Sequence, residues 1–140
     1  MIFAGIDIGS TTTKVVFFDG EKILASAVAP SGINPVVTAE ECLKKNISTT
    51  GIKDEDITLK AATGYGRRLM KNADLVVTEI KSCAAGAFFM STPEGQPRTV
   101  VDIGGQDTKV ILLDDSGEVA NFAMNDKCAA GTGHFWRFSL

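Results

Sequence analysis

The sequence predicts an α/β protein with one complete lobe, built on a mixed sheet, and the first three-stranded β-meander of a second lobe. Three observations lead to this fold class. A segment near the N-terminus recurs 95 positions later with the same order of apolar and polar residues. Between the two copies, the apolar residues change to helical spacing. The 140 residues are 44% hydrophobic and 22% charged, which is typical of a globular domain.

The repeat relates residues 7–19, DIGSTTTKVVFFD, to residues 102–114, DIGGQDTKVILLD, without a gap. The identical pairs are Asp7/Asp102, Ile8/Ile103, Gly9/Gly104, Thr13/Thr108, Lys14/Lys109, Val15/Val110 and Asp19/Asp114. Two unrelated strand–turn–strand units could share some of this chemistry by chance. Identity at Asp, Gly, Thr and Lys in one register favours a duplication.

Each copy has the pattern of an antiparallel meander of three strands. Apolar runs predict strands at residues 2–8, 14–18 and 22–29, and again at residues 99–103, 109–113 and 118–124. Asp19-Gly20 and Asp115-Ser116-Gly117 are typical hairpin turns, because glycine adopts positive φ without steric cost. A polar turn that contains glycine joins the first two strands of each copy.

Helices are expected between the copies. Asn34 as N-cap, Pro35 at the first helical position and Gly51 as the stop predict a helix over residues 35–50. Shorter patterns predict strands at 57–62 and 75–77 and a short helix at 67–72. A further helix is expected at 79–90, with Thr78 as its N-cap.

These patterns divide the chain into a first lobe at residues 1–92, a linker at 93–97 and the start of a second, incomplete lobe at 98–140. The linker is placed where two prolines and a glycine interrupt the pattern.

Composition excludes several classes of protein. A net charge of −3 provides no electrostatic footprint for nucleic acid or anionic lipid. The apolar N-terminal run lacks the basic region of a signal peptide, and no run reaches the ~20 residues of a membrane span. Three cysteines, Cys42, Cys83 and Cys128, form no disulfide framework, so we expect a cytoplasmic protein.

The polar turn of each copy has the composition of a phosphate-binding turn, because backbone N–H groups and hydroxyls converge there. The candidate phosphate-binding residues are Gly9, Ser10, Thr11, Thr12 and Lys14 in the first copy, and Gly104, Gly105, Gln106 and Asp107 in the second. Asp7 and Asp102 end the strands before the turns, where carboxylates could hold a hydrated Mg²⁺. An ordinary hairpin turn is the alternative for either copy alone, and the pair favours phosphate binding.

Cys128 lies in the segment NDKCAAGTG, at the start of a predicted helix and next to Lys127. A helix N-terminus and a neighbouring cation favour the thiolate, which suits an iron–sulfur cluster. A small buried residue is the alternative for a single cysteine. Phe135, Trp136 and Phe138 near the end of the chain are either core residues or a dimer contact.

The duplicated turns resemble those of the actin, sugar-kinase and heat-shock chaperone ATPase superfamily, whose two ribonuclease-H-like lobes bind ATP and Mg²⁺. The resemblance implies that Asp7 and Asp102 organise the metal, that the turns hold the β- and γ-phosphates, and that Gln106 or Asp102 positions the attacking water.

Four motifs in order, GIDIGSTTTK, ATGYGR, VDIGGQDTK and NDKCAAGTG, narrow this resemblance. Together they resemble the activator ATPases (component A) of 2-hydroxyacyl-CoA dehydratases, a family that includes the ATPase subunits of benzoyl-CoA reductase. The resemblance implies a homodimer with one 4Fe–4S cluster, ligated by Cys128, that passes one electron to an acyl-CoA dehydratase or reductase component. A small-molecule kinase of the same fold and a truncated, non-catalytic remnant are the alternatives.

Overall fold

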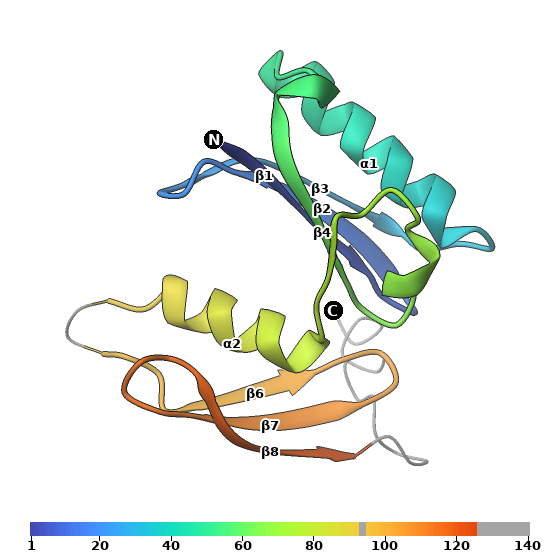
Figure 1. The fold of residues 1–140 in the computed structure, drawn as a ribbon. Helices are drawn as coiled ribbons and strands as arrows, with labels where there is room; N and C mark the ends of the chain where they lie inside the picture. Colours follow the sequence, from blue (N-terminus) through green and yellow to red (C-terminus); the bar gives the residue numbers. More distant parts are fainter. Residues whose placement is uncertain (93–94, 126–140) are drawn as a thin grey trace, which may run out of the picture. The chain divides into compact units, whose positions relative to one another are not determined.

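The computed structural model describes residues 1–92 and 95–125, and the chain divides into two compact units, residues 1–77 and 78–140. The first unit contains a five-stranded mixed sheet in the order β3-β2-β1-β4-β5, and the second contains a three-stranded antiparallel sheet in the order β6-β7-β8 (Figure 1). The predicted fold class is confirmed: an α/β unit with a mixed sheet is followed by a separate β-meander.

The first sheet begins with a meander. Strand β1 (Ile2–Ile8) pairs antiparallel with β2 (Thr12–Phe18), which pairs antiparallel with β3 (Ile23–Pro30). Strand β4 (Ile57–Thr63) runs parallel to β1, and the short β5 (Leu75–Val76) runs parallel to β4. The crossover between β3 and β4 contains helix α1, which is the usual connection between parallel strands.

Helix α1 (Pro35–Thr50) begins and ends where the sequence predicts. The Asn34 side chain accepts a hydrogen bond from the backbone N–H of Val37, and Gly51 ends the helix with a φ of 74°. The remaining helical segments of this unit are single 3₁₀ turns at Asp54–Asp56 and Arg67–Leu69, so the helix expected at 67–72 is shorter than predicted.

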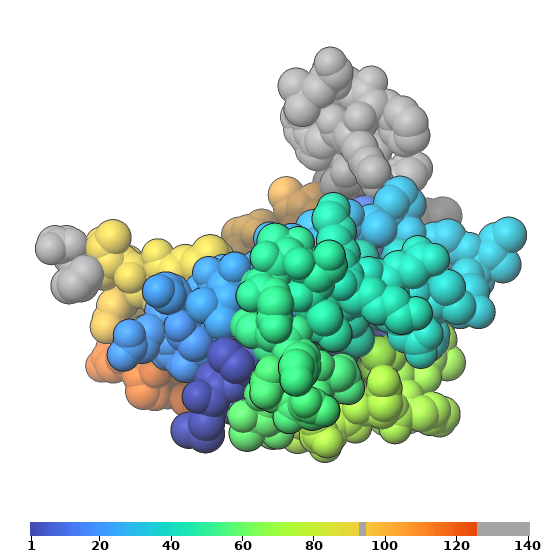
Figure 2. Space-filling model, turned by 90° about the horizontal axis from the view of Figure 1, so that it is seen from above, coloured from blue at the N-terminus to red at the C-terminus, as the bar shows by residue number. Residues whose placement is uncertain are grey.

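The core of the first unit lies between α1 and one face of the sheet. Alternate residues of β1 and β2 point into it, among them Ile6, Val15 and Phe17. Asn46 of α1 is buried, and its side-chain amide donates to the carbonyl oxygen of Val15 over 3.1 Å. Figure 2 views the molecule from the side where α1 (cyan to teal) forms the surface. This face of the first sheet is therefore covered by the helix that follows β3.

The second unit repeats the antiparallel three-stranded meander with which the first unit begins. Helix α2 (Glu79–Phe89) is followed by β6 (Thr99–Ile103), β7 (Thr108–Leu113) and β8 (Val119–Asn125), paired antiparallel in that order. Its core consists of Ala84 of α2 and Ile111 and Leu113 of β7. Within the described residues, no helix is long and apolar enough to cross a membrane.

The division between the units falls between Val77 and Thr78, whereas the sequence pattern placed the end of the first lobe at residue 92. The difference concerns α2, which packs on the second sheet through Ile80, Cys83 and Ala84. The division between the units therefore follows the sheet on which α2 packs, and the prolines and glycine of the predicted linker do not mark it.

The sequence repeat is also a repeat of backbone pairing. Asp7 lies opposite Lys14 across β1 and β2, and Asp102 lies opposite Lys109 across β6 and β7. The pairing between the second and third strands shifts register at the same place in both units. The shift lies between Phe17 and Phe18 of β2 and between Leu112 and Leu113, the equivalent positions, of β7. Both polar turns therefore join strands of the same geometry.

Candidate functional site

The first polar turn is closed by a hydrogen bond from the backbone N–H of Gly9 to the carbonyl oxygen of Thr12, over 3.1 Å. A Cβ atom at Gly9 would lie 2.6 Å from that oxygen, which is closer than real Cβ atoms approach. Glycine is therefore required for the turn to close. The turn then places Ser10, Thr11 and Thr12 at the end of the β1–β2 hairpin, with Ser10 exposed.

Ser31, which follows β3, holds this turn from the side. Its hydroxyl donates to the carbonyl oxygen of Gly9 over 2.6 Å and lies 2.9 Å from the hydroxyl of Thr13. Its backbone N–H donates to the carbonyl oxygen of Thr11 over 3.0 Å. Thr13 and Ser31 are both buried. These bonds fix the turn before any ligand arrives, which lowers the entropy lost on binding.

Asp7 lies beside the turn and forms an ion pair with Lys14, with 2.8 Å between Oδ2 and Nζ. Both side chains are partly exposed, so this pair contributes little to stability. The charge of Lys14, which the sequence analysis assigned to phosphate binding, is directed at Asp7 here. A phosphate that approached the turn could share this ammonium.

The motif ATGYGR, at residues 62–67, forms the wall next to Asp7. Gly64 has a φ of 87°, and a Cβ atom there would collide with Oδ1 of Asp7. The backbone N–H of Gly66 donates to the carbonyl oxygen of Ile8 over 2.9 Å, and the Arg67 guanidinium donates to the carbonyl oxygen of Gly64 over 2.9 Å. The motif therefore lies against the end of β1, with Gly64 next to the Asp7 side chain and Gly66 bonded to Ile8.

The second polar turn repeats the first. The backbone N–H of Gly104 donates to the carbonyl oxygen of Asp107 over 2.8 Å, at the positions equivalent to Gly9 and Thr12. A Cβ atom at Gly104 would lie 2.8 Å from Oδ1 of Asp107. Gln106 is exposed on this turn. The two glycines thus have the same structural role in the two units.

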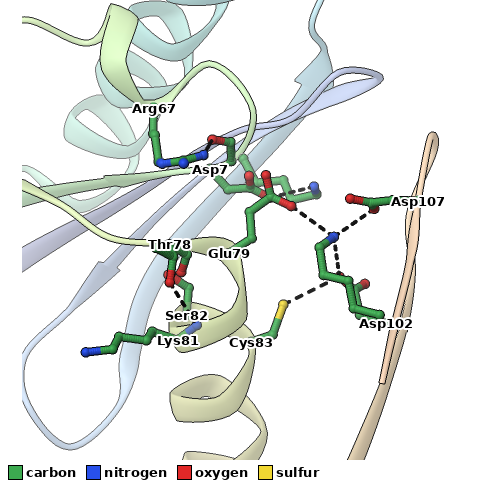
Figure 3. A network of polar contacts seen from close by, with 12 residues as sticks. Asp7, Arg67, Thr78, Glu79, Lys81, Ser82, Cys83, Asp102 and Asp107 are labelled. Atoms are coloured by element: carbon green, nitrogen blue, oxygen red, sulfur yellow. Dashed lines mark hydrogen bonds and ion pairs between the residues drawn. The ribbon is translucent and has the colours of Figure 1, made fainter. Parts of the chain in front are cut away.

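The charges behind the second turn differ from those behind the first. The ammonium of Lys109 lies 2.7 Å from Oδ1 of Asp107, 2.9 Å from Oε2 of Glu79 and 3.3 Å from Oδ2 of Asp102 (Figure 3). Its side chain is 3% exposed, whereas that of Lys14 is 45% exposed. We call these four residues the Lys109 cluster.

Burial alone would lower the pKa of Lys109, but hydrogen bonds to Asp107 and Glu79, with the charges of Glu79 and Asp102, raise it well above its ordinary value. Lys109 therefore stays protonated. The thiol of Cys83 lies 3.6 Å from Oδ2 of Asp102, so this carboxylate is held from two sides. Three carboxylates around one ammonium leave an excess of negative charge next to the turn.

The structure brings the predicted residues of each turn together within their own unit. The turn residues Gly9, Ser10, Thr11 and Thr12 lie near Asp7 and Lys14, and Gly104, Gly105, Gln106 and Asp107 lie near Asp102. Cys128 lies outside the described residues. Sequence reasoning assigned no role to Glu79 or Lys109. A role for Lys109 was signalled by its identity with Lys14 in the repeat. A role for Glu79 was signalled more weakly, by its place directly after the cap residue Thr78.

The residues at both turns suit Mg²⁺, which binds through one or two carboxylates, phosphate oxygens and water. Asp7 and Asp102 each supply one carboxylate at a turn. Within residues 1–92 and 95–125, no group of three His, Cys, Asp or Glu side chains could enclose a metal ion. The two described cysteines belong to different units, with Cys42 buried on α1 and Cys83 on α2.

Comparison with known proteins gives consistent results. Residues 4–139 match the model of the BadF/BadG/BcrA/BcrD ATPase family. The activator of lactoyl-CoA dehydratase from Anaerotignum propionicum is 45% identical over 136 residues, which cover 96% of this chain and 51% of that protein. The (R)-2-hydroxyglutaryl-CoA dehydratase activating ATPase from Acidaminococcus fermentans is 41% identical over 133 residues, which cover 94% and 49%. The chain spans about half the length of these relatives.

Solved structures show the same similarity. The activator of the 2-hydroxyisocaproyl-CoA dehydratase from Clostridium difficile, with bound ADPNP, matches with a TM-score of 0.86 and 45% identity, over 99% of this chain and 50% of that one. A hexokinase of the ROK type from Thermus thermophilus matches over 96% of this chain and 51% of that one, with a TM-score of 0.58 and 16% identity, which shows a shared fold alone. These matches confirm the actin-like ATPase fold expected from the sequence.

Proposed function

The chain belongs to the BadF/BadG/BcrA/BcrD ATPase family, and we propose that it is the N-terminal part of an ATP-hydrolysing activator of a 2-hydroxyacyl-CoA dehydratase or aryl-CoA reductase. The observation that carries this proposal is the pair of turns closed by Gly9 and Gly104, each beside an Asp–Lys pair in the same register. Two of its relatives are named as activators of acyl-CoA dehydratases, which supports a dehydratase as the partner enzyme.

In this proposal each turn binds phosphate oxygens of ATP. The backbone N–H groups and hydroxyls at Ser10, Thr11 and Thr12 donate to one phosphate, and the backbone at Gly104 and Gly105 donates to its neighbour. The fixed geometry of both turns supports this role, because phosphoryl transfer depends on positioning and on neutralised charge.

Asp7 and Asp102 would hold the hydrated Mg²⁺, which neutralises charge on the phosphates when bound. Asp102 or Gln106 would orient the water that attacks the γ-phosphate, with ADP as the leaving group. Lys109 supports this assignment, because it restrains the carboxylate of Asp102, while Gln106 is exposed on the turn and free to approach a ligand.

The finer part of the proposal is that two copies of the chain share a 4Fe–4S cluster and that ATP hydrolysis drives one electron from it to the partner enzyme. Its support is the motif NDKCAAGTG and the position of Cys128 after the second meander. Two copies of Cys128 supply two thiolates, and an all-cysteine cluster needs four. The other two would come from the part of the family sequence that this chain does not span.

The activity test compares ATP hydrolysis with phosphoryl transfer. An activator should hydrolyse ATP without any sugar or acid acceptor, and Asp102→Asn should abolish that hydrolysis. A small-molecule kinase would instead require the acceptor, and phosphorylated product would contradict the proposal.

The cluster is tested separately by anaerobic reconstitution with iron and sulfide, followed by iron analysis and EPR on the full-length activator. Cys128→Ser should lose the cluster signal, whereas the matched variant Cys42→Ser should keep it, because Cys42 is buried on α1. A protein that holds no iron, or equal iron in both variants, would contradict the cluster assignment and leave the ATPase proposal to its own test.

A further inference from the structure

One face of the second sheet is apolar and exposed. On the side away from α2, the side chains of Val101, Ile103, Val110 and Leu112 form a contiguous patch across β6 and β7. They are between 37% and 58% exposed. The other face of the same strands is buried under α2, where Ile111 is 0% exposed. We call the four exposed residues the open face.

The repeat shows what the open face should be. Its four residues occupy the positions of Ile6, Ile8, Val15 and Phe17 in the first sheet, at the constant offset of 95. None of those four is more than 1% exposed, because α1 covers them. The same strand positions are thus core in one unit and surface in the other. A patch of this kind on a small unit marks a binding surface.

The occupant of the equivalent face is the polypeptide that directly follows the third strand. In the first unit, residues 31–34 connect β3 to α1, which then packs across the sheet. In the second unit, the third strand β8 ends at Asn125, and residues 126–140 follow, with Phe135, Trp136, Phe138 and Leu140 among them.

We propose that the open face is the docking surface for residues 126–140 of the same chain, as the first sheet is for α1. The chemistry matches, since the described residues of this face bear no charge: Thr99, Thr108, Asn121 and Ala123 surround the apolar patch. Aromatic side chains fit such a surface well, because each buries a large apolar area. A tethered segment also has an effective concentration of about 1 mM or more, which favours it over a second copy at micromolar concentration.

The test uses Trp136, which is the single tryptophan of the chain. Its emission maximum and its quenching by acrylamide are measured in the full chain. Docking predicts a blue-shifted emission with weak quenching. Leu112→Asn, on the open face, should increase the undocked fraction by about tenfold and move both readouts towards those of free tryptophan.

Met124→Asn is the matched control. Met124 pairs with Lys109 and therefore lies on the opposite face of the sheet, with an exposure of 50% against 42% for Leu112. It should leave the emission and quenching of Trp136 unchanged. Circular dichroism establishes that both variants keep the fold, and Val101→Asn should repeat the effect if Leu112→Asn unfolds.

Three results would overturn the proposal. Acrylamide could quench Trp136 in the unmodified chain as strongly as it quenches free tryptophan. Alternatively, Met124→Asn could change the Trp136 emission and quenching as much as Leu112→Asn does. Light scattering could also show a dimer that Leu112→Asn converts to a monomer, in which case a second copy covers the open face. Docking on the open face does not depend on ATP binding. A negative result for docking therefore leaves the proposed ATPase function untouched, and a negative result for ATP binding leaves docking untouched.

Discussion

Replacing Lys109 by methionine removes the ammonium group that Glu79, Asp102 and Asp107 share, while it keeps most of the side-chain volume. Lys109 is 3% exposed, and its three partners have side chains between 25% and 32% exposed. The variant therefore leaves three carboxylates close together around an apolar side chain.

The size of the effect follows from the exposure of the partners. Removing one member of a fully buried ion pair costs about 3–5 kcal/mol. Water reaches part of each carboxylate here, so we expect a loss of about 2–3 kcal/mol in the free energy of unfolding of the second unit. The control is Lys14→Met at the equivalent position of the repeat. Lys14 is 45% exposed and pairs with Asp7 alone, so the expected loss is under about 1 kcal/mol.

Urea unfolding followed by far-UV circular dichroism measures both variants, with separate transitions fitted if the two units unfold independently. With a slope of about 1–3 kcal/mol per molar urea, Lys109→Met should lower the midpoint by roughly 1–2 M and Lys14→Met by much less. Equal shifts in the two variants, or no shift in Lys109→Met, would refute the account of the Lys109 cluster as a buried charge centre.

Three further predictions concern stability. Gly64→Ala should destabilise the first unit by more than about 2 kcal/mol, because a positive φ and a collision with Asp7 Oδ1 act together. The control Gly20→Ala has a positive φ but open space around the new Cβ, so it should lose only the stability that the strained backbone costs. Gly86→Ala should stabilise α2 by about 1 kcal/mol, because its Cβ would meet nothing within 4 Å; a lower melting temperature would contradict this. Burial raises the pKa of the Cys42 thiol above its ordinary 9.0, so the folded state holds the proton more tightly. That contribution is present below pH 9 and is lost as pH rises through the folded pKa, and Cys42→Ala should remove this alkaline decline in thermal stability.

Local patterns predicted most of the fold. The strands of both meanders follow from short apolar runs and from glycine at the hairpins. Helix α1 follows from Asn34, Pro35 and Gly51, because caps act over a few residues. The candidate turns were also predictable, since the repeat places Gly9 and Gly104 in the same local geometry.

Features that depend on packing between distant segments were not predictable in this way. Lys14 and Lys109 are the same residue in the same motif, yet one is half exposed and the other buried. The difference arises because α2 covers the face on which Lys109 lies, and it brings Glu79 within 2.9 Å. The assignment of α2 to the second unit has the same cause. No pattern within α2 itself shows which sheet it will cover.

The most direct measurement of the central claim, that the two turns bind nucleotide phosphates, is isothermal titration calorimetry with ADPNP and Mg²⁺. Gly9→Ala places a Cβ atom 2.6 Å from the carbonyl oxygen that closes the first turn, and Gly104→Ala places one 2.8 Å from Oδ1 of Asp107 in the second. Gly86→Ala is the neutral control, because its Cβ would meet nothing within 4 Å. The account predicts that the unmodified chain and Gly86→Ala bind ADPNP and that each turn variant weakens binding by about tenfold or more. Absence of binding, or equal affinity in all four proteins, would contradict it.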